Sequence, residues 1–194
     1  MQQYTLEQQR ADFSNRRFLA MPLSGLLVWL TLALTGWLLP PYQATLAIFL
    51  GTGGIVYLGM LLARFTGESL NFNKKQKNPF DALFLHGVGM AFLVYALAIP
   101  FFLADYRSLP FTVGVLTGLM WLPLGWIIQH WIGVIHAVAR TLLCTLCWVF
   151  FPEHSLVMIP LVIVAIYLIS IITLERRWQR LNRQQSNGQL EVAR

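Results

Sequence analysis

An imidazole and a guanidinium lie one helical turn apart in an otherwise apolar stretch, QHWIGVIHAVARTLLC. His136 and Arg140 are four residues apart, so a helix would place both side chains on the same face. A central arginine costs about 2.5–3.5 kcal/mol to insert into a membrane, and such a residue faces the bundle interior, a water-filled cavity or a partner. The planar guanidinium binds anionic groups through a fork of donors. We therefore predict that Arg140 and His136 bind a small anion or a lipid head group.

Two further side chains could join this site from another part of the chain. Asp81 and His86 lie in KNPFDALFLHG, where a different apolar segment begins. Asp81 is expected to cap its own helix or to pair with Arg140. His86 would enter the membrane from the same side as His136 and to a similar depth, so the two rings would face each other if their helices are neighbours. Asp81 and His86 are therefore predicted as additional substrate-binding residues.

Other interpretations of the same polar residues stay open. His86 and His136 could be the axial ligands of a haem, or could bind a metal together with Asp81, because imidazole suits both uses. His136, Arg140 and an acid could instead form a proton relay. The groups could also do no more than hydrogen-bond one another and fix the packing of the helices. We predict no cofactor, with haem or metal on the two histidines as the alternative.

The rest of the chain predicts what must position these residues. Of the 194 residues, 57% are hydrophobic and 11% charged, whereas a soluble domain carries about 25% charged residues. A membrane span needs about 20 mostly apolar residues, and only helices satisfy the backbone for this pattern. The sequence therefore predicts an all-α polytopic membrane bundle with six transmembrane helices, at residues 18–39, 44–62, 80–103, 109–128, 132–151 and 156–174.

Basic residues predict the orientation of the bundle. With the N-terminus in the cytoplasm, all the lysines and arginines outside the spans except Arg107 fall on the cytoplasmic side: Arg10, Arg16, Arg17, Arg64, Lys74, Lys75, Lys77, Arg176, Arg177, Arg180, Arg183 and Arg194. Residues 1–17 would then be a cytoplasmic segment and residues 175–194 a basic cytoplasmic tail that prolongs the last helix and meets anionic lipid head groups. This topology explains the net charge of +6 without nucleic acid as a partner.

Small residues and one proline predict how the helices meet. Gly51 and Gly54 in the second span, and Gly114 and Gly118 in a G-x-x-x-G pattern in the fourth, would let helix backbones approach closely. These glycines are expected to be packing seams within one subunit, or else the seam of a homo-oligomer or of a contact with a partner helix. Pro123, in MWLPLGW, removes a helix hydrogen bond and is predicted, together with Gly125, to form a hinge.

Two features that could suggest other chemistry have simpler explanations. Cys144 and Cys147 form a C-x-x-C pair, but they lie in the C-terminal half of a helix, where the helix dipole does not favour a thiolate, so we expect packing residues. The basic and apolar N-terminal run resembles a signal peptide, but its apolar part is longer than usual and no cleavage site closes it. It is therefore expected to be the first span.

Three short motifs give the chain a family resemblance: RRFLAMPLSGLLVW near the start, KNPFDALF before the third span and GLMWLPLGW in the fourth. In these motifs, and in its order of spans and loop lengths, the chain resembles a small family of uncharacterised bacterial membrane proteins. The resemblance implies a multi-span bundle in a bacterial inner membrane. It implies no reaction and assigns no functional residues.

Together these observations predict a binding or transport module for a small anion or a lipid head group, with a polar cavity open to the cytoplasm. Arg140 would supply the charge and the histidines would orient the ligand. The alternative is a non-catalytic structural or assembly subunit whose polar residues only hold the bundle together. A membrane enzyme that uses haem or a metal is the third possibility.

Overall fold

The polypeptide is helical along both stretches that the computed structural model describes, residues 4–68 and 78–192. The α-helices in chain order are α1 (Leu6–Ser14), α2 (Ala20–Leu38), α3 (Pro41–Thr66), α4 (Pro79–Leu93), α5 (Tyr95–Ala104), α6 (Leu109–Gly118), α7 (Trp121–Ile127), α8 (Ile132–Phe150) and α9 (Ser155–Val192). Two short 3₁₀ turns, η1 (Tyr106–Ser108) and η2 (Pro152–His154), precede α6 and α9. Neither stretch contains a strand, so the predicted all-α class is confirmed.

Six segments within the described residues are long and apolar enough to cross a membrane. They are Ala20–Leu38, Pro41–Thr66, Pro79–Ala104, Tyr106–Ile127, Ile132–Phe150 and Pro152–Gln184. The number agrees with the six predicted spans, and the chain is a multi-pass membrane protein.

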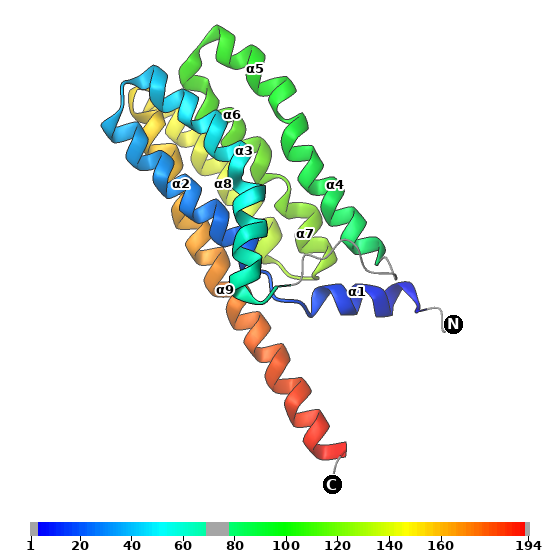
Figure 1. Cartoon of the computed structure of the whole chain (residues 1–194). Coiled ribbons are helices and arrows are strands. Elements are labelled where there is room, and N and C mark those ends of the chain that lie inside the picture. Colours follow the sequence, from blue (N-terminus) through cyan, green and yellow to red (C-terminus); the bar gives the residue numbers. More distant parts are fainter. Residues whose placement is uncertain (1–3, 69–77, 193–194) are drawn as a thin grey trace.

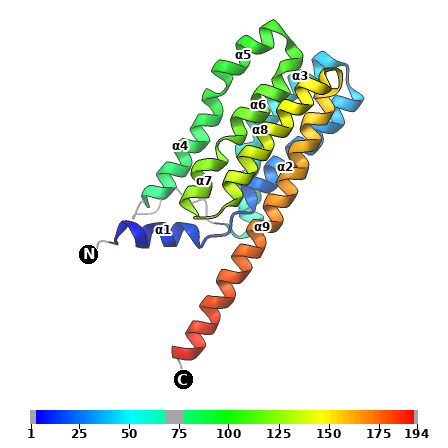
Figure 2. The same ribbon diagram turned by 180° about the vertical axis from the view of Figure 1, so that it is seen from behind.

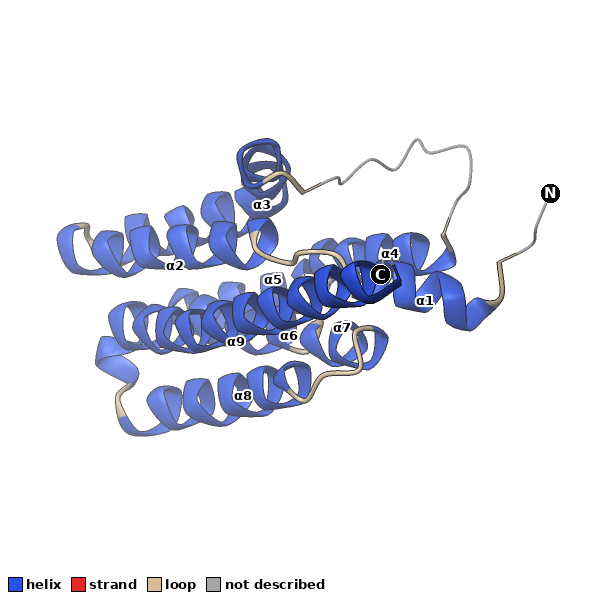
Figure 3. Cartoon of the chain, turned by 90° about the horizontal axis from the view of Figure 1, so that it is seen from below, coloured by secondary structure: helices blue, strands red, loops and turns tan. Residues whose placement is uncertain are grey.

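Two helical hairpins form the centre of the bundle. α2 packs along α3, α8 packs along α9, and α9 also packs against α2 (Figure 1). α6 lies against both α8 and α9. Viewed from below, α2 and α3 lie on one side of α9 and α8 lies on the other (Figure 3). The fully buried side chains of Trp29, Ile159 and Ile163 belong to this core, so α9 is its central helix.

The fourth span is interrupted one turn before its proline. α6 ends at Gly118 and α7 begins at Trp121. Pro123 has no N–H to donate to the carbonyl of Leu119, and its ring would collide with that carbonyl in a regular helix. The Leu119 carbonyl accepts the N–H of Leu122 instead, at 3.1 Å. The break therefore has a local cause in the sequence.

The third span lies at the edge of the bundle. Only 6% of its most apolar window is buried inside the protein, against 44% for the fourth span. Figures 1 and 2 show α4 leaning away from the other helices toward the end of the bundle where α1 lies. Most of α4 therefore lies outside the packed core of the bundle.

The short helix α1 lies across one end of the bundle, below α4 and α7 in Figure 1. It begins with a capping box: the Thr5 hydroxyl accepts the Gln8 N–H at 3.3 Å, and the Gln8 side chain accepts the Thr5 N–H at 2.9 Å. Its buried Phe13 packs against the rings of Phe80 and Phe84 on α4. Within the segment predicted only as cytoplasmic, the helix α1 therefore supports the start of α4, and we call α1 the brace.

Other residues of α1 form hydrogen bonds with the end of α7 and with α9. Arg10 donates to the Ile127 carbonyl at 3.2 Å, and the Ser14 hydroxyl donates to the Ile128 carbonyl at 3.3 Å. Arg177 of α9 donates to the Ser14 carbonyl at 2.8 Å. α9 itself continues past the bundle as a single helix, so α1 and the tail lie at the same end (Figures 1 and 2).

Candidate functional site

Arg140 is completely buried near the middle of α8, on the inner face of the bundle. Its Nη2 donates to the Thr117 hydroxyl of α6 at 2.8 Å, and its Nη1 lies 3.4 Å from the Tyr167 hydroxyl of α9. The guanidinium carbon lies 5.4 Å from the centroid of the Trp29 ring and 5.5 Å from that of Tyr167. The cation is therefore held by hydroxyls and aromatic faces.

Gly118 of α6 leaves room for the Arg140 side chain where α6 and α8 approach closely, because it carries no Cβ atom. A Cβ atom added to Gly118 would lie 2.8 Å from the Arg140 Cδ and 3.2 Å from its Cγ. A Cβ added to Gly114, one turn earlier, would lie 3.2 Å from Ile163. In this fold the G-x-x-x-G pattern of the fourth span therefore packs within the subunit, against α8 and α9.

No carboxylate among the described residues forms an ion pair with Arg140. The partly buried carboxylates that form ion pairs do so with other arginines. Asp81 pairs with Arg16, and Glu175 pairs with Arg17 at 2.7 Å. The Nε atom of Arg140 is buried and has no hydrogen-bond partner in the part of the chain that the structure describes. The considered Asp81–Arg140 pair is thus replaced by Asp81–Arg16, because α1 lies beside the start of α4.

His136 lies one turn before Arg140 and is also completely buried. Its ring stacks on Trp121, with the centroids 3.7 Å apart and the planes 9° from parallel. Its Nδ1 lies 2.8 Å from the Ser170 hydroxyl, which itself donates to the Ile166 carbonyl, so the histidine Nδ1–H donates to Ser170. The buried Nε2 has no hydrogen-bond partner within residues 4–68 and 78–192. His136 therefore joins α7, α8 and α9 beside the guanidinium.

The structure does not bring the other predicted residues to this centre. His86 is exposed on α4, and its Nδ1 lies 2.7 Å from the Ala82 carbonyl of its own helix. It does not pair with His136, and Asp81 is held by Arg16 near α1. Within residues 4–68 and 78–192, no three His, Cys, Asp or Glu side chains gather as a metal site would require.

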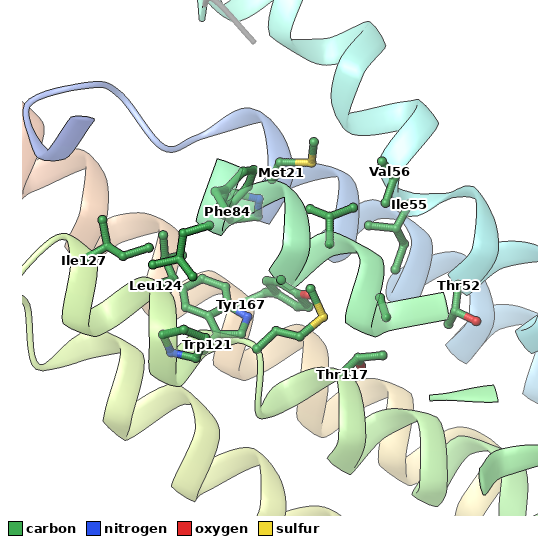
Figure 4. A pocket seen from close by; sticks show the side chains of 17 residues that line it. Met21, Thr52, Ile55, Val56, Phe84, Thr117, Trp121, Leu124, Ile127 and Tyr167 are labelled. Atoms are coloured by element: carbon green, nitrogen blue, oxygen red, sulfur yellow. The ribbon is translucent and has the colours of Figure 1, made fainter. Parts of the chain in front are cut away.

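A cleft of about 140 Å³ lies beside the Arg140 centre. α3 and α4 contribute apolar side chains to it, and α2 closes one side with Met21 and Pro22. Its inner wall contains Thr117, Trp121 and Tyr167, the residues that hold Arg140 and His136 (Figure 4). In the same view, Met21 and Val56 lie across the cleft from Trp121 and Thr117.

The cleft is linked to Arg140 by the hydroxyl groups of two residues that line it, Thr117 and Tyr167. The arginine itself is 0% exposed and does not line the cleft, so this cleft is not the polar cavity expected around the guanidinium. The Thr117 hydroxyl donates to the Val113 carbonyl at 2.6 Å. For the Tyr167 hydroxyl proton, no acceptor lies within hydrogen-bond distance among the described residues. Tyr167 is therefore the group that can donate to a ligand while it accepts from the cation.

The predicted hinge residues have distinct positions. Pro123 lines the cleft on α7. Gly125 faces α8, where a Cβ atom would lie 2.8 Å from the Cα of Gly133. Gly125 is therefore part of a tight α7–α8 seam, and a hinge motion at Pro123 stays a prediction.

The remaining glycines and cysteines of interest also have clear surroundings. A Cβ at Gly51 would lie 3.1 Å from Leu32 of α2, whereas one at Gly54 would meet nothing within 4 Å. Cys144 and Cys147 are buried free thiols, and the Cys144 sulfur would lie 3.6 Å from a Cβ at Gly114. The cysteines thus occupy packing positions in the bundle.

Other charged groups are paired at the α1 end of the bundle. The hydrogen bond and the charge of Glu175 raise the pKa of the Arg17 guanidinium. Burial raises the pKa of the Glu68 carboxyl, although this carboxyl accepts the Leu19 and Ala20 N–H groups at 2.9 and 2.8 Å. These contacts fix the start of α2 and leave Arg140 as a separate charged centre.

Several residues of this centre carried no signal in the sequence. Tyr167 and Ser170 are three residues apart in a uniformly apolar helix, and Trp121 resembles any interfacial tryptophan. They contribute because α9 and α7 turn them toward α8. The missed brace α1 did carry a signal, the Thr5-x-x-Gln8 capping box.

The fold and the site together define a class: a polytopic α-helical membrane protein with a charged centre buried in its bundle beside an apolar cleft. Within that class, the chain belongs to the family of unknown function DUF7010, whose profile matches residues 6–177. The predicted membership in an uncharacterised family is thereby confirmed. No match was found among curated proteins or among solved structures.

Proposed function

We propose that this protein is a membrane-embedded binding module for an anionic group, a carboxylate or a phosphate, which docks on the Tyr167 hydroxyl in front of Arg140. The observation that carries the proposal is a completely buried guanidinium with no carboxylate partner in the described chain, linked by two hydroxyls to the wall of a cleft. A buried charge without an opposite charge is costly, and an anion beside it recovers part of that cost.

The geometry favours binding at the cleft wall rather than passage through the bundle. Arg140 is shielded by Thr117, Tyr167 and Trp29, so a ligand reaches its field but not its nitrogens. In a low-dielectric site, a charge acts strongly over several ångströms. The Tyr167 hydroxyl, polarised by Arg140, supplies the direct hydrogen bond to the ligand, and such a charge-assisted bond is stronger than a neutral one.

The test compares ligands that differ only in the head group. Purified protein in a neutral detergent is heated with palmitate, with the matching primary alcohol or with inorganic phosphate. A ligand at about a hundredfold excess over its Kd stabilises the folded state by about 2.7 kcal/mol. We expect palmitate or phosphate to raise the unfolding temperature and the alcohol to leave it unchanged. Equal shifts for acid and alcohol, or no shift with any of them, would refute the proposal.

Tyr167→Phe tests the role of the hydroxyl. We expect this variant to lose most of the difference between acid and alcohol, because its ring stays in place while the donor is gone. Tyr95→Phe is the control: the Tyr95 hydroxyl is likewise hydrogen-bonded within the bundle, to Thr52, but Tyr95 does not line the cleft. A Tyr167→Phe protein that still prefers the acid as strongly as the Tyr95→Phe control would show that Tyr167 is structural.

We further propose that the shared end of α1 and the α9 tail faces the cytoplasm of a bacterial inner membrane. The basic residues support this orientation, because in the predicted topology all lysines and arginines except Arg107 and the intramembrane Arg140 fall on this side. The exposed arginines Arg176, Arg180 and Arg183 lie on one face of α9, where they can meet anionic head groups.

Cysteine labelling tests this orientation. In a background without Cys144 and Cys147, single cysteines replace Glu153 at one end and Arg183 at the other, both exposed. A membrane-impermeant maleimide should label position 153 in intact cells and position 183 only after the membrane is opened. The reverse pattern would overturn the proposed topology.

A further inference from the structure

We infer that the ligand of the Arg140 centre carries a hydrocarbon chain that lies in the cleft between α3 and α4, so that the ligand arrives from the bilayer. The inference rests on the proposed anion-binding function and names the class of its ligand: a membrane lipid with one carboxylate or phosphate head.

The walls of the cleft match a chain better than a hydrated ion. Its outer residues on α3 and α4 include Ile55, Val56, Leu83, Phe84 and Val88, all of them apolar. An isolated anion that crossed such walls would lose its hydration without compensation. A lipid already lies in hydrocarbon, and its chain gains close packing against these side chains when it enters the cleft.

The opening lies on the side of the bundle that meets lipid. α4 belongs to the span with the smallest buried fraction, and it diverges from α3 toward the α1 end (Figure 1). A Cβ atom added to Gly87 of α4 would meet nothing within 4 Å, although Gly87 lines the cleft. The cleft is therefore open beside this glycine.

The polar groups sit where a head group would end its path. Thr117 and Tyr167 belong to the inner wall, on α6 and α9, and both contact Arg140. Thr52 on α3 also lines the cleft, but its hydroxyl is bonded to the Ile48 carbonyl and the Tyr95 hydroxyl. The hydroxyls that contact Arg140 therefore lie together on the inner wall. A head group bound there would leave its hydrocarbon chain to extend outward between α3 and α4.

Two glycines on one helix allow a matched test. Gly87 lines the cleft, whereas Gly89 does not, and a Cβ at either position would meet nothing within 4 Å. Gly87→Leu should fill the cleft, and Gly89→Leu should place the same side chain on the outer surface. Both changes improve the helix propensity of α4 equally, so folding does not separate them.

The experiment uses the full-length protein in lipid nanodiscs and a palmitate analogue with a photoreactive group on its chain. We expect cross-links to peptides from α3 and α4, reduced about tenfold by Gly87→Leu, equivalent to about 1.4 kcal/mol, and unchanged by Gly89→Leu. An excess of unlabelled palmitate should compete for the cross-links.

The outcomes separate this inference from the proposed function. Cross-links that Gly87→Leu does not reduce would overturn the cleft inference, even where anions still stabilise the protein. Stabilisation by inorganic phosphate equal to that by palmitate would also overturn it, because the chain would then add nothing. Equal, Gly87-dependent cross-linking of the acid and the alcohol analogues would support the cleft as a chain site and overturn the anionic head.

Discussion

Arg140→Met is expected to make the protein more stable and, at the same time, unable to distinguish an anionic ligand from a neutral one. The methionine keeps much of the length of the side chain and removes a charge that lacks a carboxylate partner in the described chain. Replacing a buried ion pair by apolar residues of similar volume is often neutral or stabilising by about 1–4 kcal/mol, and we expect removal of a buried charge that has no carboxylate partner to act in the same direction. We expect a gain of about 2 kcal/mol, since the two hydrogen bonds to Thr117 and Tyr167 are lost in return.

This result decides between the binding module and the structural alternative. If the polar residues only hold the bundle together, removal of the guanidinium should cost stability, because it joins α8 to α6 and α9. The measurement is thermal unfolding of the purified variant, together with the comparison of palmitate and its alcohol. Arg107→Met is the control, because Arg107 belongs to an exposed pair with Glu153 in the short turns η1 and η2 and should have little effect. A less stable Arg140→Met protein would favour the purely structural role.

Gly133→Ala should have the largest effect in the opposite direction. A Cβ atom at this position would collide with the backbone carbonyl of Trp121 and would lie 2.5 Å from the Cα of Gly125. Neither atom belongs to a flexible side chain, so α7 must move away from α8. We expect a loss of about 3 kcal/mol, at the upper end of the usual cost of overpacking.

The same change should disturb the charged centre. Trp121 stacks on His136 and lines the cleft, so a shift of α7 separates the two rings. We therefore expect Gly133→Ala also to weaken the stabilisation by palmitate. Gly53→Ala is the control on α3, where an added Cβ meets nothing within 4 Å and the better helix propensity gives about 1 kcal/mol of stability. Similar unfolding temperatures for the two variants would contradict the tight α7–α8 seam.

The burial of His136 and Arg140 was predictable because the cost of exposing a polar or charged side chain to lipid depends only on its own segment. A histidine and an arginine on one face of an apolar helix must turn inward, and both are completely buried. The interruption near Pro123 has a local cause too, the missing N–H of the proline. By contrast, no short-range rule links Arg140 to Thr117 or to Tyr167, which are 23 and 27 residues away.

The predicted partners on the third span show where such reasoning stops. Depth along a helix places His86 and Asp81 at definite levels, but it does not say which way α4 turns or how far it stands from α8. In the fold, α4 lies at the edge and His86 bonds its own helix. Asp81 pairs with Arg16, which follows α1, a helix that was not predicted. This edge position of α4, which lines the cleft, was not predictable either.

The sequence by itself determined an all-α chain with six spans and a charge buried in the fifth, because hydrophobic length, backbone satisfaction and the cost of a cation in hydrocarbon are properties of each segment alone. The tertiary structure alone decided what surrounds that charge: hydroxyls and aromatic rings from other helices instead of a carboxylate, with an apolar cleft beside them. Helices in a membrane associate through close packing of particular side chains, and which faces meet is settled only when all of them are packed together.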